Sequence, residues 1–304
     1  MREVAVIGVG MTPWGKFPER DLFDLGADAA QRAIEDAGVE WTDIESMVSG
    51  VYKWGSEAGL ASGQSVAARL GETGIPITNV YQMCANATNA LRLAYLSIAS
   101  GECDLALALG LDKSPKGFFS TVGREPTDAM YLRWSMVGLS NPAYWALDCR
   151  QRMEKYGTTE VHLAKVKVAT SKHGALNPNA RYRKVFTVEE VLNSPMVCDP
   201  LRLYEICATS DGAAAAVLCS MDKARKYTSK PIILAGVGLG SSIYGDISSR
   251  LGVLCVPAKE EAPFLSESVT ASKMAYENAG IGPESIDFVE LPDNSSWHYL
   301  QYLE

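Results

Sequence analysis

A short segment that occurs twice restricts the fold of this chain more than any other feature. Asp36-Ala-Gly-Val-Glu-Trp-Thr-Asp-Ile44 returns as Asn278-Ala-Gly-Ile-Gly-Pro-Glu-Ser-Ile286, at an offset of 242 residues. Each copy follows a helix-like stretch and, further back, an apolar run that ends in glycines, Val4–Gly10 and Ile232–Gly240. Similar segments in the same order indicate a duplicated structural unit. The sequence therefore predicts two related α/β halves.

The first copy indicates the order of its elements. Val4–Gly10 is typical of a buried strand, and Asp21–Gly38 carries apolar residues at helical spacing before a terminal glycine. Ile44–Val51 predicts the next strand, so we expect helices packed against a largely parallel sheet. Only 18 residues follow Ile286. We therefore expect the second half to be incomplete in this chain.

A long polar stretch interrupts the first half. We place the halves at residues 1–230 and 231–304, with an insertion at about 113–200 that is rich in aromatic residues. Two helices are expected inside it, near Pro142–Tyr156 and Glu160–His173. Structureless loops of this length are uncommon in compact domains, and long loops are often functional. We expect the insertion to be a lid over a bound ligand.

Composition disfavours several functional classes. Lys plus Arg is 28 and Asp plus Glu is 36, a net charge of −8, which disfavours nucleic acid and anionic membranes as partners. No stretch approaches the ~20 apolar residues of a membrane span, so no membrane association is expected. The seven cysteines include no C-x-x-C pair, and the start has no signal-peptide pattern. We expect a cytoplasmic protein with free thiols, no metal, and no cofactor of its own.

A dinucleotide cofactor is disfavoured by one residue. Gly8-Val-Gly10 begins the glycine fingerprint of such sites, but Pro13 stands where the third glycine is required.

Cys84 is the first candidate for chemistry. It lies where a strand-like run turns into an Ala- and Leu-rich helix. The positive end of a helix dipole lowers the pKa of a thiol and favours the nucleophilic thiolate. The alternative is a small buried apolar residue, a common role of cysteine.

A second group of candidates follows the strand predicted after the second copy. Asp293, His298, Tyr299 and Tyr302 all carry side chains that can move protons or bind polar groups. The end of a strand is where α/β folds place ligands and catalytic groups. Alternatively, Asp293 and its neighbours cap the next helix.

Several longer motifs occur along the whole chain. Besides the turn at Cys84, they are Ile7-Gly-Val-Gly-Met-Thr-Pro-Trp-Gly15, Asn177-Pro-Asn-Ala180, Thr187-Val-Glu-Glu-Val-Leu-Asn-Ser-Pro195, Cys207-Ala-Thr-Ser-Asp-Gly-Ala-Ala-Ala215 and Asn278-Ala-Gly280. In content and order, these motifs resemble the thiolase superfamily, specifically its sterol-carrier or lipid-transfer type. The resemblance implies a thiolase fold of duplicated βαβ halves in five layers (α-β-α-β-α), a tight homodimer and an acyl-CoA substrate.

Two departures from the family pattern bear on the reaction. Asn86-Ala87 stands where the family has Ser-Gly, and Pro292 aligns with the Asn or His of the family's strand-end motif. Proline has no side-chain donor, so the oxyanion contact from that position is missing. Loss of one such donor typically costs about a hundred- to thousandfold in rate. Thiolysis and Claisen condensation are therefore disfavoured.

The sequence is more similar to a subgroup of steroid side-chain retro-aldolases, which cleave a β-hydroxy acyl-CoA and leave a ketone. This reaction needs a base for the hydroxyl proton and a hydrogen-bonding site for the thioester enolate. The resemblance implies a lyase with Tyr299 as base or proton shuttle, and with Asp293, His298 and Tyr302 as further candidates. A phenol that acts as a base must have its pKa lowered from about 10.

The same resemblance implies a partner. Members of this subgroup bind a small chain that combines an OB-fold with a zinc ribbon, giving an α2β2 complex with zinc only in the partner. Two alternatives remain open. One is a lipid-transfer-type thiolase that transfers acyl groups through Cys84. The other is a non-catalytic acyl-CoA-binding scaffold.

Overall fold

The structure is a computed structural model that describes residues 1–51, 61–114, 140–243 and 266–304. Two compact units make up the chain. Unit 1 consists of Met1–Pro115 and Ser210–Val237, and unit 2 of Lys116–Thr209 and Gly238–Glu304. These units group the predicted insertion with the C-terminal segment. The division of the chain into two duplicated halves at residue 230 stays a prediction from the sequence repeat.

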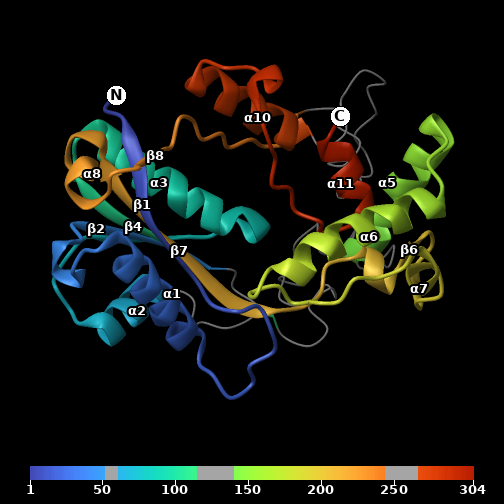
Figure 1. The fold of residues 1–304 in the computed structure, drawn as a ribbon, viewed down its shortest axis with the longest axis horizontal. Helices are drawn as coiled ribbons and strands as arrows, with labels where there is room; N and C mark the ends of the chain where they lie inside the picture. The colour runs from blue at the N-terminus through green and yellow to red at the C-terminus, as the bar shows by residue number, and fades with distance from the viewer. Residues whose placement is uncertain (52–60, 115–139, 244–265) are drawn as a thin grey trace, which may run out of the picture. The chain divides into compact units, whose positions relative to one another are not determined.

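Unit 1 is built on a six-stranded sheet with the strand order β3-β2-β4-β7-β1-β8 (Figure 1). The strands are β1 (Val4–Met11), β2 (Ser46–Val51), β3 (Ile77–Val80), β4 (Leu105–Lys113), β7 (Asp211–Ser220) and β8 (Ile232–Ile233). β2 pairs in parallel with β3 and β4, whereas β7 inserts antiparallel between β4 and β1. The sheet is therefore mixed, not largely parallel as the sequence predicted.

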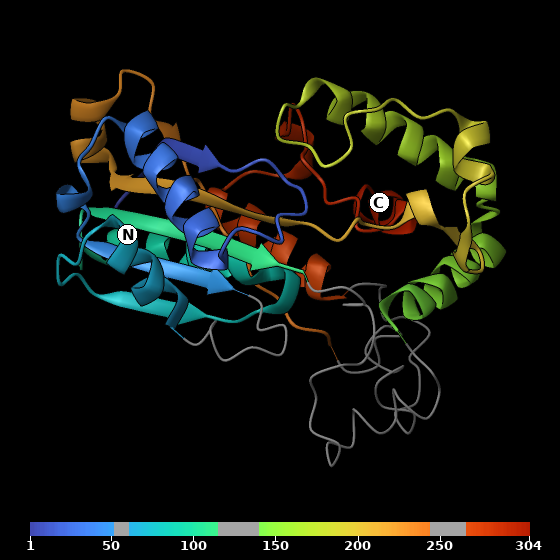
Figure 2. The same ribbon diagram turned by 90° about the horizontal axis from the view of Figure 1, so that it is seen from below.

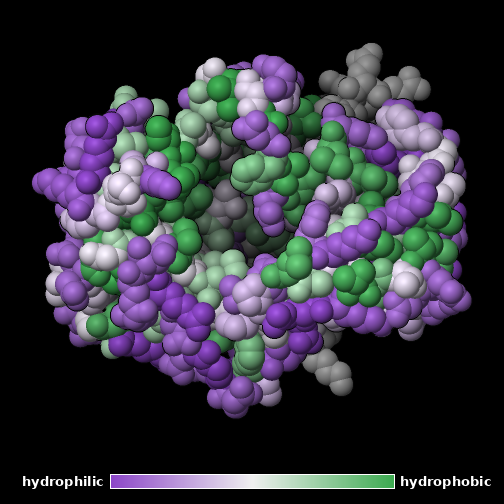
Figure 3. Space-filling model, viewed as in Figure 1, coloured by the Kyte–Doolittle hydropathy of each residue, from purple (hydrophilic) through white to green (hydrophobic). Residues whose placement is uncertain are grey.

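Helices cover both faces of this sheet (Figures 1 and 2). They are α1 (Leu22–Ala37), α2 (Ser62–Leu70), α3 (Asn86–Ser100) and α8 (Met221–Tyr227). Because successive strand residues point to opposite faces, β4 serves two cores at once. Leu107 and Leu109 pack in the core that contains α1, and Ala106 and Ala108 pack in the core that contains α3. Figure 3 shows hydrophilic residues gathered over the outer face of α1, as expected for an amphipathic helix.

The repeat appears as matching backbone geometry. α1 ends at Gly38 with φ 65°, and α10 (Ser266–Ala279) ends at Gly280 with φ 69°. Glycine adopts this left-handed conformation without steric cost. A 3₁₀ turn follows each helix, Trp41–Asp43 after the first and Pro283–Ser285 after the second. The paired segments therefore share a helix, a left-handed cap and a turn.

The glycines before each helix also correspond. A Cβ at Gly8 or Gly10 would collide with main-chain atoms of α1, and one at Gly238 or Gly240 would collide with main-chain atoms of α10. Each pair lets a chain segment lie directly against its helix. The second copy differs in its strands: β8 covers only Ile232–Ile233, and residues 286–291 form no strand with any described residue.

Unit 2 contains helices, short strands and two small cores. The two helices predicted in the insertion are confirmed as α5 (Asn141–Tyr156) and α6 (Glu160–Leu176). The other elements are α7 (Val188–Leu192), β5 (Met196–Cys198), β6 (Leu201–Arg202), a 3₁₀ turn (Leu203–Glu205), α10 and α11 (Ser296–Tyr302). The aromatic-rich part of the insertion, residues 115–139, lies outside the described residues, and the lid remains a prediction.

None of the helices in the described part of the chain combines the length and apolar character needed to cross a membrane.

Candidate active site

The polar run of the C-terminal segment leads into α11 (Ser296–Tyr302). Ser295 is fully buried and is the N-cap residue, and its Oγ accepts the main-chain N–H of His298 at 3.3 Å. A bridge between Ser295 and Ile206 ties this turn to the loop before β7. The capping alternative therefore describes Ser295. It does not describe Asp293, which caps no helix in the described residues.

His298 is enclosed by aromatic rings. Its Nδ1 lies 2.7 Å from the Oγ of Ser295, and its ring centroid lies 5.2 Å from that of Trp145, 4.3 Å from that of Trp297 and 5.9 Å from that of Tyr302. Only 3% of the residue is exposed, and this burial lowers the pKa of the imidazole to about 3. A neutral imidazole of such low basicity anchors α11 and is a poor proton acceptor at neutral pH.

Tyr299 and Tyr302, on the same helix, are less buried than His298. Both are half-buried and lie three positions apart in the chain, so their side chains are neighbours on the helix surface. The main-chain N–H of Tyr299 donates to the carbonyl of Ser295 at 3.2 Å.

Asp293 lies beside a lysine that the sequence analysis did not select. The Nζ of Lys167 is 3.9 Å from Oδ2 of Asp293, and its side chain is only 11% exposed. The same Nζ lies 5.3 Å from the ring centroid of Tyr182 and 5.8 Å from that of Phe186. Burial lowers the pKa of Lys167, and the charges of Asp293 and Cys207 oppose this effect.

The folded helix α6 shows how unusual the position of Lys167 is. Leu163, Ala164 and Ser171 are buried on α6. Lys167 lies four residues after Leu163, three after Ala164 and four before Ser171, which places it on the same face of the helix. A lysine on the buried face of a helix is an unusual position for a charged residue.

Cys84 belongs to unit 1, whereas the other candidate residues belong to unit 2. It occupies a 3₁₀ turn, Met83–Ala85, directly before α3. The residue is solvent-exposed, yet the surrounding protein desolvates the thiolate and the carboxylate of Asp112 repels it, so the pKa of the thiol is raised. A main-chain hydrogen bond opposes the shift without reversing it. The expected lowering of this pKa by the helix terminus is therefore wrong.

The segment after Cys84 fits closely against two strands. Asn86 and Ala87 lie over Gly50 of β2 and Gly110 of β4. A Cβ at Gly110 would collide with the Cβ of Ala87, so the absence of a side chain at Gly110 leaves room for the alanine. This pairing accommodates the side chain that departs from the family's Ser-Gly.

Glu205 is a second titratable residue that the sequence analysis missed. It is 2% exposed, and its Oε2 accepts the main-chain N–H of Arg202 at 2.9 Å. Its Oε1 is buried and has no hydrogen-bond partner among the described residues. Burial raises the pKa of Glu205 to about 7. No periodicity or motif in Leu203-Tyr-Glu205 indicated this environment.

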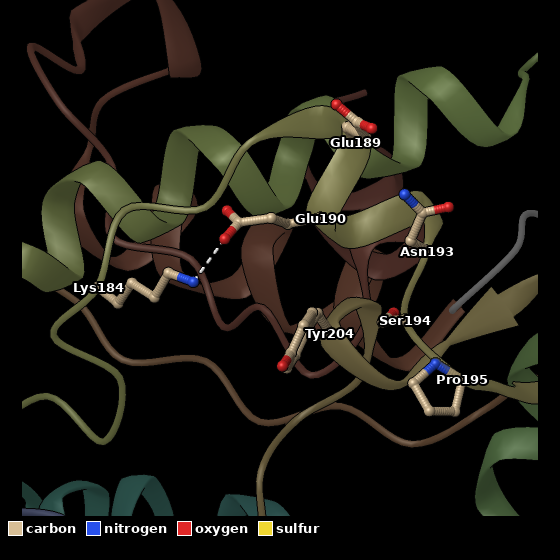
Figure 4. A pocket seen from close by; sticks show the side chains of 7 residues that line it. All are labelled: Lys184, Glu189, Glu190, Asn193, Ser194, Pro195 and Tyr204. Carbon is tan, nitrogen blue, oxygen red and sulfur yellow. Dashed lines mark hydrogen bonds and ion pairs between the residues drawn. The ribbon is translucent and has the colours of Figure 1, made fainter.

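An open pocket of about 410 Å³ lies elsewhere in unit 2 (Figure 4). Figure 4 shows Lys184 pointing toward Glu190, which it contacts at 2.5 Å. None of the predicted site residues lines this pocket. Its Tyr204 packs on Phe186, with ring centroids 4.6 Å apart, so the pocket borders the aromatic cluster beside Lys167.

No three His, Cys, Asp or Glu side chains converge on a metal site in the described ranges. The expectation that the chain holds no cofactor remains a prediction.

The chain is similar to several known proteins. A family profile described as "Thiolase, N-terminal domain" matches residues 4–222. Acetyl-CoA acetyltransferase of Methanothermobacter thermautotrophicus is 35% identical over 303 residues, covering 96% of this chain and 74% of the relative. Sterol carrier protein 2 of Homo sapiens is 32% identical, covering 99% of this chain and 55% of the relative. The solved Ltp2-ChsH2(DUF35) aldolase matches with a TM-score of 0.82 and 26% identity, over 99% of this chain and 76% of that chain.

Proposed function

Because this chain belongs to the thiolase superfamily, and to its lipid-transfer type, we propose that it is a lyase that cleaves a β-hydroxy acyl-CoA by a retro-aldol reaction. The observation that carries this proposal is the similarity to the Ltp2-ChsH2(DUF35) aldolase, which extends over 99% of the chain. The mixed α/β fold and acyl-CoA chemistry are common to the superfamily. The choice of cleavage over acyl transfer is the proposal.

The reaction needs no covalent intermediate. A base removes the proton of the β-hydroxyl, the bond between the α and β carbons breaks, and the β carbon becomes a ketone. The electron pair passes to the α carbon as a thioester enolate, and protonation of the enolate gives the shorter acyl-CoA. We assign the base to Tyr299, with Asp293 and Tyr302 as further candidates; His298, with a pKa of about 3, is the weakest candidate.

The environment of Cys84 favours cleavage over acyl transfer. An acyl transfer through Cys84 needs the thiolate, and the surroundings raise the pKa of this thiol. Acyl transfer remains the second candidate function because an acetyl-CoA acetyltransferase is 35% identical over 96% of the chain.

The substrate and assembly complete the proposal. We propose a steroid side-chain CoA thioester as the substrate, giving a ketosteroid and a short acyl-CoA, in the cytoplasm. We further propose a homodimer that binds a small OB-fold and zinc-ribbon partner as α2β2. The partner is supported by the name of the matching aldolase, which joins Ltp2 to a second component, ChsH2(DUF35).

The test is C–C cleavage of a 17-hydroxy steroid side-chain CoA ester by the full-length protein with its partner, with and without free CoA. Ketone release without free CoA supports the lyase. Turnover of a β-ketoacyl-CoA only when CoA is added would overturn it.

A Cys84→Ser variant separates the two candidate functions within the same assay. Retro-aldol cleavage should be retained by this variant, because no bond to sulfur forms. Acyl transfer through Cys84 should be abolished.

A further inference from the structure

The ammonium group of Lys167 makes fewer hydrogen bonds than its three N–H donors allow. An ammonium carries three N–H donors and satisfies them at distances near 2.7–3.2 Å. The Asp293 carboxylate, at 3.9 Å, is too far for such a bond, and Nζ makes no hydrogen bond within the part of the chain that the structure describes. The rings of Tyr182 and Phe186 face the cation but offer it no hydrogen-bond acceptor.

Lys167 also lies next to candidate catalytic groups. α6 packs against α11, and Lys167 reaches from α6 to the segment that leads into α11. Asp293, its ion-pair partner, is itself 47% exposed and is one of the candidate catalytic residues. A desolvated charge held next to candidate catalytic groups is typical of a functional site.

Retro-aldol cleavage requires a group of this kind. The thioester oxygen gains negative charge as the C–C bond breaks, and the reaction is fast only where preorganised donors or cations meet that charge. A cation in a partly dehydrated site stabilises it more than a hydrated surface lysine does. The same ammonium can hydrogen-bond to the ground-state carbonyl without forming a covalent bond.

We propose that Lys167 binds the thioester oxygen of the acyl-CoA and stabilises the enolate formed on C–C cleavage. This role rests on the proposed lyase function. In the cleavage, the base takes the hydroxyl proton, the electron pair moves to the enolate, and Lys167 donates a hydrogen bond to the enolate oxygen. Lys167 keeps its proton throughout, and the proton that the base removed from the hydroxyl is the one delivered to the α carbon.

Two variants and one control test this role by kinetics. K167M keeps the length of the side chain and removes the donor, and we expect a loss in kcat of about a hundred- to thousandfold, as for other oxyanion donors. K167R keeps a permanent charge and should recover part of the rate. K165M changes an exposed lysine of the same helix and should match the wild type in kcat and melting temperature.

The pH profile separates chemistry from folding. Asp293, Cys207 and Tyr182 face Lys167, and burial lowers the pKa of its ammonium. The wild-type rate should therefore fall on the alkaline side as Lys167 loses its proton. That fall should be absent in K167R, whose guanidinium stays charged. A purely structural lysine would leave the profile unchanged, and an unchanged profile would overturn the proposal.

A labelling experiment tests the binding role of Lys167 without catalytic turnover. Acetic anhydride modifies neutral amines, and mass spectrometry compares Lys167 with Lys165 in the full-length protein. Acetonyl-CoA, a ketone analogue that cannot be cleaved, should protect Lys167 alone; equal labelling with and without it would overturn the binding role. If the wild type shows no cleavage, the lyase function fails, and protection by acetonyl-CoA then decides the binding role of Lys167. If the wild type cleaves and K167M cleaves equally, Lys167 fails and the lyase function stands.

Discussion

Moving one methyl group between α3 and β4 tests how the turn after Cys84 is held. In the wild type, Ala87 carries the methyl group and Gly110 carries none. A Cβ added at Gly110 would collide with the Cβ of Ala87 and would lie 3.2 Å from its Cα and 4.0 Å from its main-chain nitrogen. The side chain of Ala87 is thus the main obstacle to a side chain at 110.

The expected loss of stability follows from this geometry. Inserting a methyl group into a packed site costs about 1–3 kcal/mol. Replacing glycine by alanine in a strand returns roughly 0.5–1 kcal/mol. We therefore expect Gly110→Ala to lower the free energy of unfolding by about 1–2 kcal/mol, measured by urea denaturation followed by circular dichroism.

A second change should restore the stability. Ala87→Gly removes the opposing methyl group and alone should cost up to about 1 kcal/mol in helix propensity. The double variant A87G/G110A should be close to the wild type, since one methyl group has only changed places. The two changes should therefore show a coupling energy of about 1–3 kcal/mol.

Gly50 provides the matched control. A Cβ there would meet the main chain, at 2.7 Å from the carbonyl carbon of Asn86 and 3.1 Å from the nitrogen of Ala87. Truncation of a side chain cannot relieve that contact, so Ala87→Gly should fail to rescue Gly50→Ala. If A87G/G110A is no more stable than G110A alone, the close approach of Ala87 to Gly110 is not what limits this site.

Three further changes test individual side chains. Burial lowers the pKa of His298 to about 3, whereas an unfolded histidine titrates near 6.5, so folded His298 takes up its proton only at much lower pH. Unfolding free energies should show the wild type losing up to ~1.4 kcal/mol per pH unit relative to His298→Asn as the pH falls from about 6.5 toward 3, and a constant difference would contradict the burial. Burial raises the pKa of Glu205 to about 7, so the folded state holds a proton that the unfolded chain releases above about 4.3. The wild type should lose stability as the pH rises through this window, so the free energy of unfolding of Glu205→Gln relative to the wild type should rise by ~2–3 kcal/mol between pH 5 and pH 8; no rise would place Glu205 in a wetter site. Tyr299→Phe should lower kcat for cleavage by about a hundredfold or more with an unchanged melting temperature, and equal losses in Tyr299→Phe and Tyr302→Phe would remove the assignment of Tyr299 as the base.

Local backbone features were predictable because they depend on neighbouring residues. Gly38 and Gly280 end their helices in the left-handed conformation, as the repeated Ala-Gly indicated. The boundaries of α1, α5 and α6 lie within a few residues of those predicted from helical spacing and capping residues. In each of these cases, the information lies within a few residues of the chain.

Strand pairing was less predictable, since it depends on segments far apart. The strand β7 is largely buried and consists mainly of small residues. Its apolar composition does not encode direction, so the antiparallel pairing with β1 and β4 could not be inferred from it. The strand predicted after Ile286 lacks a partner among the described residues, and a strand without a ladder partner is not defined.

The electrostatic predictions required the packed structure. For Cys84, the argument from the helix terminus was locally sound, but desolvation and Asp112 outweigh it. Asp112 lies 28 positions further along the chain, on β4, and only the fold brings its charge to the cysteine. Lys167 shows the same dependence, because its partners Tyr182, Phe186 and Asp293 come from other segments.

The polar side chains of the C-terminal run differ in their environment: some are buried and anchor α11, and others are more exposed. This difference reduces the number of candidates for the base. Ser295 and His298 are buried and bond to each other, and the His298 ring packs against Trp145, which holds α11 in place. An imidazole held neutral in this way has little capacity left to take a proton from a substrate. Asp293, beside Lys167, remains exposed, and the half-buried Tyr299 follows one residue after the anchor. The anchored pair fixes the turn, and we therefore expect the proton transfer of the proposed lyase reaction to involve the residues on either side of it.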